Sequence, residues 1–136
     1  MHSIRLRGPW ELYLPGSEQP LRIEMPATWG ALYALCSAAA PLPSPARLVR
    51  RFGKPTGLTP EDRLQLVIQS NAADCQVELN GQRLGTIAPA ATSCSWEVTS
   101  LNPRNELVIL LTVPPRAMLP AEGACPLAEI RLDILS

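Results

Sequence analysis

The residues of this sequence that could do chemistry are few, and their pattern does not predict catalysis. The only adjacent acidic pair, Glu61-Asp62, follows Pro60 where a strand is expected to begin, which is typical of a solvated turn. The only histidine is His2, so a nucleophile–histidine arrangement would have to recruit the first residues of the chain. No glycine-rich phosphate-binding motif occurs. We therefore predict that the chain is not an enzyme.

The cysteines do not form a metal-binding pattern. They are widely spaced, no two lie in a CxxC pair, and histidine is missing around them, so no zinc site and no cofactor are expected. Cys75 falls on the inward face of a predicted strand, where cysteine usually acts as a small hydrophobic residue. The sequence would allow a Cys75–Cys94 disulfide if their strands face each other. We expect four free thiols instead, at Cys36, Cys75, Cys94 and Cys125.

Length and composition predict one globular domain over residues 1–136, with 46% hydrophobic and 18% charged residues. The 12 basic and 12 acidic residues cancel, which argues against nucleic acid or an anionic membrane surface as partner. The first residues lack the pattern of a signal peptide, and the apolar run Gly30–Ala40 is too short to cross a bilayer. We expect a soluble, cytoplasmic protein.

The stretch Arg63–Leu111 organises the predicted fold. Leu64, Leu66 and Ile68 alternate with polar residues, which indicates a strand with one buried face. A second alternating run, Cys75–Leu79, leads into Asn80-Gly81, and both of these residues tolerate the positive φ that a type I′ hairpin turn requires. A strand buried on both faces is expected at Glu106–Val113.

Short strands separated by proline and glycine turns are predicted along the rest of the chain. The total is eight or nine strands and no convincing amphipathic helix, although Trp29–Ser44 is ambiguous. This pattern predicts an all-β fold, an antiparallel β-sandwich of jelly-roll type. The further strands are expected at Pro9–Leu14, Leu21–Glu24, Ala46–Phe52, Gln82–Ile87, Trp96–Thr99 and Leu127–Leu135.

Several segments, in order and over most of the chain, resemble a known family. The chain is similar to the N-terminal sugar-binding domain of the glycoside hydrolases that include β-galactosidase and β-glucuronidase, a jelly-roll with a galactose-binding-like fold. The most specific segment is the hairpin Val77–Gly85, which resembles the family's Asn-Gly hairpin. The other matching segments are Trp10–Leu12, Glu24–Trp29, Val49–Phe52, Trp96–Thr99 with Leu101, and Asn105–Leu107.

The resemblance implies the fold and a sugar-binding role, and not the family's hydrolase activity. In the resembled enzymes the two catalytic carboxyl groups come from a barrel, and this sequence ends at Ser136 without one. The sequence also departs from the family in the Ala88–Ala91 loop, which lacks the usual glycine- and histidine-bearing segment, and at Val49, where tyrosine is expected.

Four residues are the candidate ligand-binding set. Tyr33 could offer a ring to the apolar face of a pyranose, because Trp10, Trp29, Phe52 and Trp96 are expected in or beside the core. Asn71 and Asp74 lie in one loop and could accept hydrogen bonds from sugar hydroxyls, although both are also ordinary turn residues. Arg51 could line a concave sheet face or pair with a neighbouring carboxylate.

The leading hypothesis is thus a non-catalytic binding module with carbohydrate as its partner. The alternative is a protein-interaction or scaffold module that acts through a homo-oligomer or a partner chain. This alternative rests on exposed sheet edges and on the apolar segment Ala31–Ala40, which could pack against another protein.

Overall fold

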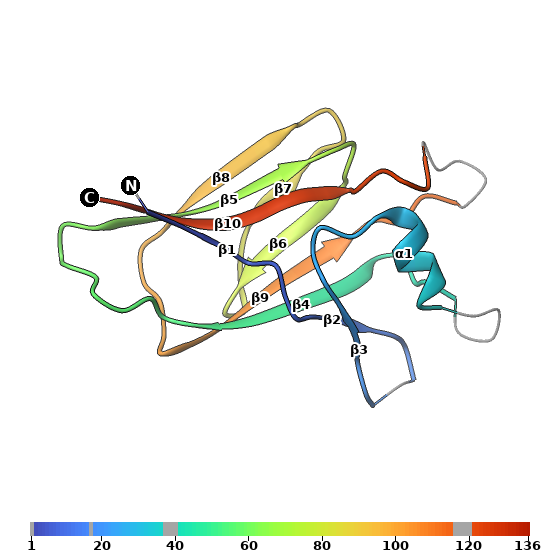
Figure 1. Cartoon of the computed structure of the whole chain (residues 1–136), viewed down its shortest axis with the longest axis horizontal. Helices are drawn as coiled ribbons and strands as arrows, with labels where there is room; N and C mark the ends of the chain where they lie inside the picture. Colours follow the sequence, from blue (N-terminus) through green and yellow to red (C-terminus); the bar gives the residue numbers. More distant parts are fainter. Residues whose placement is uncertain (1, 17, 37–40, 116–120) are drawn as a thin grey trace.

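The computed structural model describes residues 2–16, 18–36, 41–115 and 121–136 as a sandwich of two β-sheets with one short helix at one end (Figure 1). The predicted all-β sandwich is confirmed. The elements in these residues are β1 (His2–Arg5), β2 (Trp10–Tyr13), β3 (Leu21–Ile23), α1 (Trp29–Ala34), β4 (Ala46–Gly53), β5 (Arg63–Ser70), β6 (Cys75–Leu79), β7 (Gln82–Ile87), β8 (Ser93–Val98), β9 (Arg104–Leu111) and β10 (Leu127–Leu135).

Both sheets are antiparallel and mix strands from distant parts of the sequence. The four-stranded sheet has the order β1-β10-β5-β8, and the six-stranded sheet has the order β3-β2-β4-β9-β6-β7. The last strand, β10, lies between β1 and β5, with His2 paired to Ile134 and Leu66 paired to Leu132. As predicted, β9 lies inside its sheet and is largely buried on both faces, while β3 forms an edge.

Two elements differ from the sequence-based prediction. Strand β1 was not predicted, because its residues are mostly exposed and show no alternation; it is held by backbone pairing with β10. The ambiguous segment after Pro26 contains α1, which begins where the Thr28 hydroxyl accepts a hydrogen bond from the Ala31 amide at 3.0 Å. Helix α1 buries Trp29 and Leu32 in the core, so part of the predicted apolar interaction segment is used internally. Residues 37–40 of that segment lie outside the described residues.

The core lies between the sheets and is built from the inward positions of both. Trp10, Leu12 and Leu48 from the six-stranded sheet are fully buried. Leu66, Ile68 and Leu132 from the four-stranded sheet face them. The tryptophan positions were predicted correctly, since Trp10 and Trp29 are buried and Trp96 is half-buried against the core.

Cys75 is one of these inward positions and is 2% exposed. Burial, with a smaller contribution from the negative charge of Asp74, raises the pKa of the Cys75 thiol to about 12. The side chain is therefore a neutral thiol at physiological pH and packs as a small hydrophobic residue, as predicted. The chain's four cysteines are free in the structure.

The Asn80-Gly81 turn has the predicted conformation, with φ of 53° at Asn80 and 81° at Gly81, and Leu79 pairs with Gln82 across it. The Asn80 side chain also binds the start of β9. Its Oδ1 accepts a hydrogen bond from the Glu106 amide at 2.8 Å, and its Nδ2 donates to Asn105 Oδ1 at 3.0 Å. The hairpin tip is thus tied to the next strand by side-chain bonds.

Replacing Gly81 with valine should lower the free energy of unfolding by more than about 1 kcal/mol, because a β-branched residue resists the positive φ. Nothing lies within 4 Å of the added Cβ, so the effect would report backbone strain rather than a clash. Urea denaturation measures it. A loss below about 0.5 kcal/mol, the range of neutral surface substitutions, would contradict the strain argument.

Candidate functional site

Of the four residues predicted to bind a ligand, the structure places Arg51 apart from Asp74, at the other end of the six-stranded sheet. Tyr33 lies on α1 and is half-buried, and its hydroxyl donates to the Pro114 carbonyl at 3.0 Å. The ring is therefore tied to the strand end that follows β9. Its role as a platform for a sugar stays a prediction.

Arg51 lies on the outer face of the six-stranded sheet and is engaged by its neighbours. It forms ion pairs with Glu11 on β2 and with Glu106 on β9, the latter at 3.3 Å, and it donates to the Tyr13 hydroxyl at 3.2 Å. The hydrogen bond to Tyr13, together with the two carboxylates, raises the pKa of Arg51. Arg47 lies over the Tyr13 ring at 4.9 Å. These contacts fit the cross-strand pairing that was the alternative interpretation of Arg51.

Asn71 and Asp74 are both exposed in the loop between β5 and β6. Asp74 borders a shallow hollow of about 450 Å³ on the outer face of the six-stranded sheet, together with Gln76, Thr86 and Thr112. This hollow lies at the opposite end of that face from Arg51. Along β9 the two ends are five residue steps apart, from Glu106 to Leu111, or about 17 Å at about 3.4 Å per residue.

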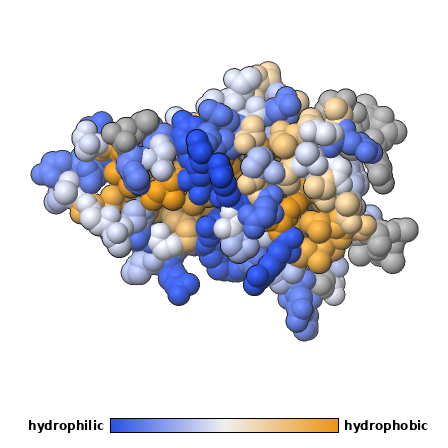
Figure 2. Space-filling view, in the orientation of Figure 1, coloured by the Kyte–Doolittle hydropathy of each residue, from blue (hydrophilic) through white to orange (hydrophobic). Residues whose placement is uncertain are grey.

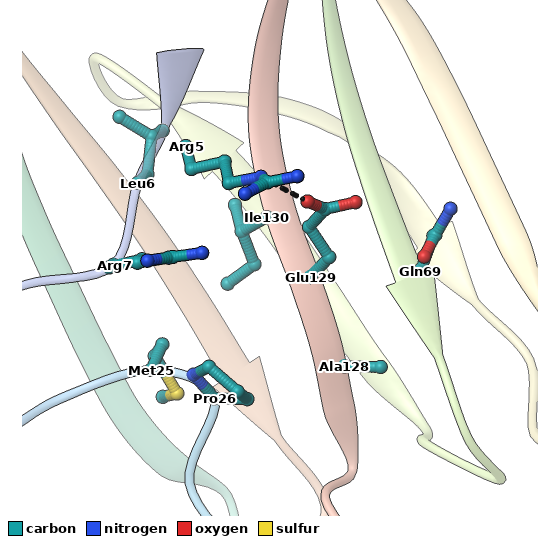
Figure 3. Close-up of a pocket in the computed structure, with 9 residues that line it drawn as sticks. All are labelled: Arg5, Leu6, Arg7, Met25, Pro26, Gln69, Ala128, Glu129 and Ile130. Carbon is teal, nitrogen blue, oxygen red and sulfur yellow. Dashed lines mark ion pairs between the residues drawn. The ribbon is translucent and has the colours of Figure 1, made fainter. Parts of the chain in front are cut away.

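A cleft that the sequence did not predict lies at the junction of the two sheets. We name it the Arg5–Arg7 cleft; its volume is about 360 Å³ (Figure 3). It lies among β10, the end of β5, the connection between β1 and β2, and the connection between β3 and α1. The residues lining it are Arg5, Leu6, Arg7, Met25, Pro26, Gln69, Ala128, Glu129 and Ile130.

The backbone around the cleft is fixed by hydrogen bonds from three directions. The Leu6 amide donates to the Ile130 carbonyl at 2.8 Å, which joins the β1–β2 connection to β10. The Met25 amide donates to the Arg7 carbonyl at 2.7 Å, which joins the two connections to each other. The buried indole of Trp10 donates to the Leu6 carbonyl at 2.7 Å. The residues that carry Arg5 and Arg7 are therefore held by the core and by both sheets.

Gly8 lies in this connection, against the side chain of Glu24. A Cβ atom at this position would lie only 2.2 to 2.9 Å from the carboxylate atoms of Glu24. A side chain at this position would therefore displace the carboxylate end of the flexible Glu24 side chain.

An ion-pair cluster forms one wall of the cleft. Arg5 Nε lies 2.9 Å from Glu129 Oε1, and Arg131 Nη1 lies 2.9 Å from the other oxygen of Glu129. Arg131 also binds Asp133, which is 5% exposed and accepts a 2.6 Å hydrogen bond from Ser3. The bond to Asp133 is the main reason that the pKa of Arg131 is raised. Arginine side chains thus contact both carboxylate oxygens of Glu129.

The surface view shows a hydrophilic band that crosses the middle of the molecule (Figure 2). Hydrophobic surface flanks the band, including the side nearer α1. In the close-up, the Arg7 side chain reaches from the β1–β2 connection toward β10, below the Arg5–Glu129 pair and above Met25 and Pro26 (Figure 3). The cleft thus combines charged groups with apolar walls.

Two further hollows meet at the end of the sandwich away from α1, with volumes of about 750 and 260 Å³. They share the residues from Glu97 to Ser100, and the larger one is bordered by the loop that contains Glu61 and Asp62. The Asp62 carboxylate accepts a hydrogen bond from the Thr59 amide at 2.8 Å, so it stabilises a turn, as predicted.

Within the described residues, no group of three histidine, cysteine or acidic side chains could hold a metal ion. The one helix in those residues has six residues, and none there has the length and apolar character needed to cross a membrane.

Comparison with known proteins supports the fold. No family model and no curated protein sequence matches the chain. Several solved structures do match the fold. One is an FMN-binding β-glucuronidase from Facaelibacterium prausnitzii L2-6, which is 22% identical in sequence with a TM-score of 0.68. The match covers 96% of this chain and 22% of that one. A β-glucuronidase from Bacteroides uniformis is 16% identical with a TM-score of 0.70, covering 98% of this chain and 18% of that one. A β-D-mannosidase from Dictyoglomus thermophilum is 13% identical with a TM-score of 0.68, and the match covers 98% of this chain and 22% of that one.

The chain therefore has the galactose-binding-like sandwich fold that occurs in glycoside hydrolases of this kind, as the resemblance of the sequence implied. It spans about a fifth of each of these three solved chains. It is similar in fold to one domain of those enzymes, and the match does not extend to most of their length.

Proposed function

We propose that this chain is a non-catalytic accessory domain of the glycoside hydrolase type that binds carbohydrate in the Arg5–Arg7 cleft. The observation that carries the proposal is the composition of the cleft on a sandwich of this fold. The exposed ring of Pro26, backed by the buried Met25 and Ile130, gives an apolar wall for the C–H face of a sugar ring. Gln69 and Glu129 can accept hydrogen bonds from the hydroxyls of the sugar.

The contacts of Glu129 and Asp133 support the non-catalytic part of the proposal. Glycoside hydrolysis requires one carboxyl group that is protonated and able to act as a general acid. Glu129 lines the cleft but is paired with Arg5 and Arg131, and Asp133 is paired with Arg131. Arginine side chains contact both oxygens of Glu129 and both oxygens of Asp133, so neither carboxyl group is placed to give a proton to a leaving group.

A thermal-shift screen against neutral and acidic mono- and oligosaccharides tests the proposal. A ligand at about a hundred times its dissociation constant adds about 2.7 kcal/mol to the free energy of unfolding and should raise Tm by several degrees. Gln69→Ala should abolish the shift. Gln76→Ala is the matched control, because Gln76 is an exposed strand glutamine that borders the Asp74 hollow instead.

The control also separates the two candidate surfaces. Loss of the shift in Gln76→Ala alone would move the sugar site to the Asp74 hollow and contradict the assignment to the Arg5–Arg7 cleft. No shift with any saccharide would contradict the sugar-binding proposal and favour the alternative, a protein-interaction module. The oligomeric state, measured by analytical ultracentrifugation, would then be the next test of that alternative.

A further inference from the structure

We propose that the ligand of the Arg5–Arg7 cleft is an acidic saccharide, whose carboxylate is held between the guanidinium groups of Arg5 and Arg7. This inference rests on the proposed sugar-binding function and names the chemical class of its ligand. The inference is based on the arginine side chains around the cleft, some of which are paired with carboxylates while others are not.

The arginines around the cleft differ in how far they are engaged. Arg131 is engaged by two carboxylates, since it binds both Glu129 and Asp133. Arg5 contacts Glu129 through Nε, and its side chain remains 60% exposed. For the Arg7 side chain, the described part of the chain provides no hydrogen bond and no ion pair, and this side chain points along the cleft (Figure 3). The cleft therefore offers the guanidinium of Arg7 and the outer nitrogens of Arg5 to a ligand.

The balance of charge favours a single negative charge on that ligand. The charged residues that line the cleft are two arginines, Arg5 and Arg7, and one carboxylate, Glu129, so this cluster keeps one positive charge. A guanidinium group matches the planar geometry of a carboxylate and binds it through two parallel hydrogen bonds. A carboxylate placed in the cleft would complete the charge pairing of this cluster.

The remaining polar groups indicate that the ligand also carries hydroxyls. The Glu129 carboxylate accepts hydrogen bonds and does not donate them, and the Gln69 amide can do both. A bare inorganic anion has no donor to offer Glu129 and would be repelled by it. A uronic acid has a carboxylate for the arginines, hydroxyl donors for Glu129 and Gln69, and a C–H face for the ring of Pro26. The cleft is also within the size range of small-molecule sites, about 300–1,000 Å³.

The test compares three probes by titration calorimetry: methyl glucuronide, methyl glucoside and acetate. The glucuronide should bind at least about tenfold more tightly than the glucoside, since one charge-assisted pair accounts for a factor of that order. Arg7→Gln should remove this preference. Arg83→Gln is the matched control, because Arg83 is also exposed but lies on β7 at the far edge of the six-stranded sheet.

Each outcome decides the inference. If the glucuronide is preferred, and Arg7→Gln removes the preference while Arg83→Gln does not, the inference holds. Equal binding of glucuronide and glucoside overturns it but leaves the sugar-binding function intact, whereas no binding of either overturns both. If acetate binds as tightly as the glucuronide, the site is a simple anion site and the saccharide assignment is wrong. If Arg7→Gln and Arg83→Gln lower the affinity for glucuronide by the same factor, binding depends on the net charge of the chain alone, and the inference is wrong.

Because Arg7 is exposed and its side chain has no described partner, Arg7→Gln should keep the fold. Two-dimensional amide spectra of the variant verify this point and locate binding independently. In the wild-type chain, glucuronide should shift the amide signals of Leu6, Ala128 and Ile130. Shifts confined to the Asp74 hollow or to the far end of the sandwich would contradict the assignment even if the affinities follow the expected order.

Discussion

Replacing Trp10 with alanine should lower the free energy of unfolding by about 3–5 kcal/mol, the cost typical of removing a large aromatic side chain from a core. Trp10 is 0% exposed and lies between the sheets. Its indole also donates to the Leu6 carbonyl, so the substitution leaves a cavity and a backbone acceptor without its partner. Urea denaturation followed by circular dichroism measures the change. A loss below about 2 kcal/mol would contradict this expectation, because it would mean that neighbouring side chains fill the cavity.

Trp10→Phe separates the two causes. Phenylalanine keeps most of the apolar contact but has no N–H, so we expect a smaller loss of about 1–3 kcal/mol, the cost of leaving a buried acceptor unpaired. If Trp10→Phe costs as much as Trp10→Ala, the hydrogen bond to Leu6 outweighs the packing. Since Leu6 precedes Arg7, this variant should also loosen the connection that carries Arg7 and weaken glucuronide binding.

Replacing Asn105 with alanine should cost about 2–4 kcal/mol, because several groups lose their partner at once. Asn105 is 3% exposed. Its Oδ1 accepts from the Asn102 amide at 2.9 Å and from Asn80 Nδ2 at 3.0 Å, and its Nδ2 donates to the Asn102 carbonyl at 2.9 Å. One buried side chain thus joins the turn before β9 to the β6–β7 hairpin.

Asn102→Ala is the matched control, because Asn102 is exposed and contributes to this network through its backbone. Its expected loss is within about 0.5 kcal/mol, as for other surface substitutions. A double-mutant cycle of Asn105→Ala with Asn80→Ala should show a coupling energy of at least about 0.5 kcal/mol. Additive losses would show that the two asparagines act independently.

The strands could be predicted where local chemistry determines them. Alternation of apolar and polar residues placed β5 and β6, and the Asn80-Gly81 pair placed the turn, because these signals arise within a few residues. Strand β1 could not be found in this way. Its residues carry no buried face of their own, and only pairing with β10, at the other end of the chain, holds them in place.

The candidate site was less predictable than the fold, since it depends on contacts between distant residues. Arg51 looked available in the sequence, but Glu11 and Glu106 on neighbouring strands engage it. The Arg5–Arg7 cleft exists because β1 pairs with β10, which brings Arg5 next to Glu129 and Arg131. Nothing in the local sequence around Arg5 and Arg7 predicts that these residues will lie beside a strand from the other end of the chain.

The position of β10 also has a consequence for how the domain folds as it is synthesised. All strands of the six-stranded sheet are present once Leu111 has been made, so that sheet can form early. In the other sheet, among the strands of the described residues, β1 pairs with β10 alone, and β5 pairs with β8 alone until β10 has been made. The ribosome adds β10 last of these strands. The apolar inner face of the six-stranded sheet therefore stays incompletely covered until residues 127–135 emerge, and during that interval the nascent chain is most exposed to aggregation.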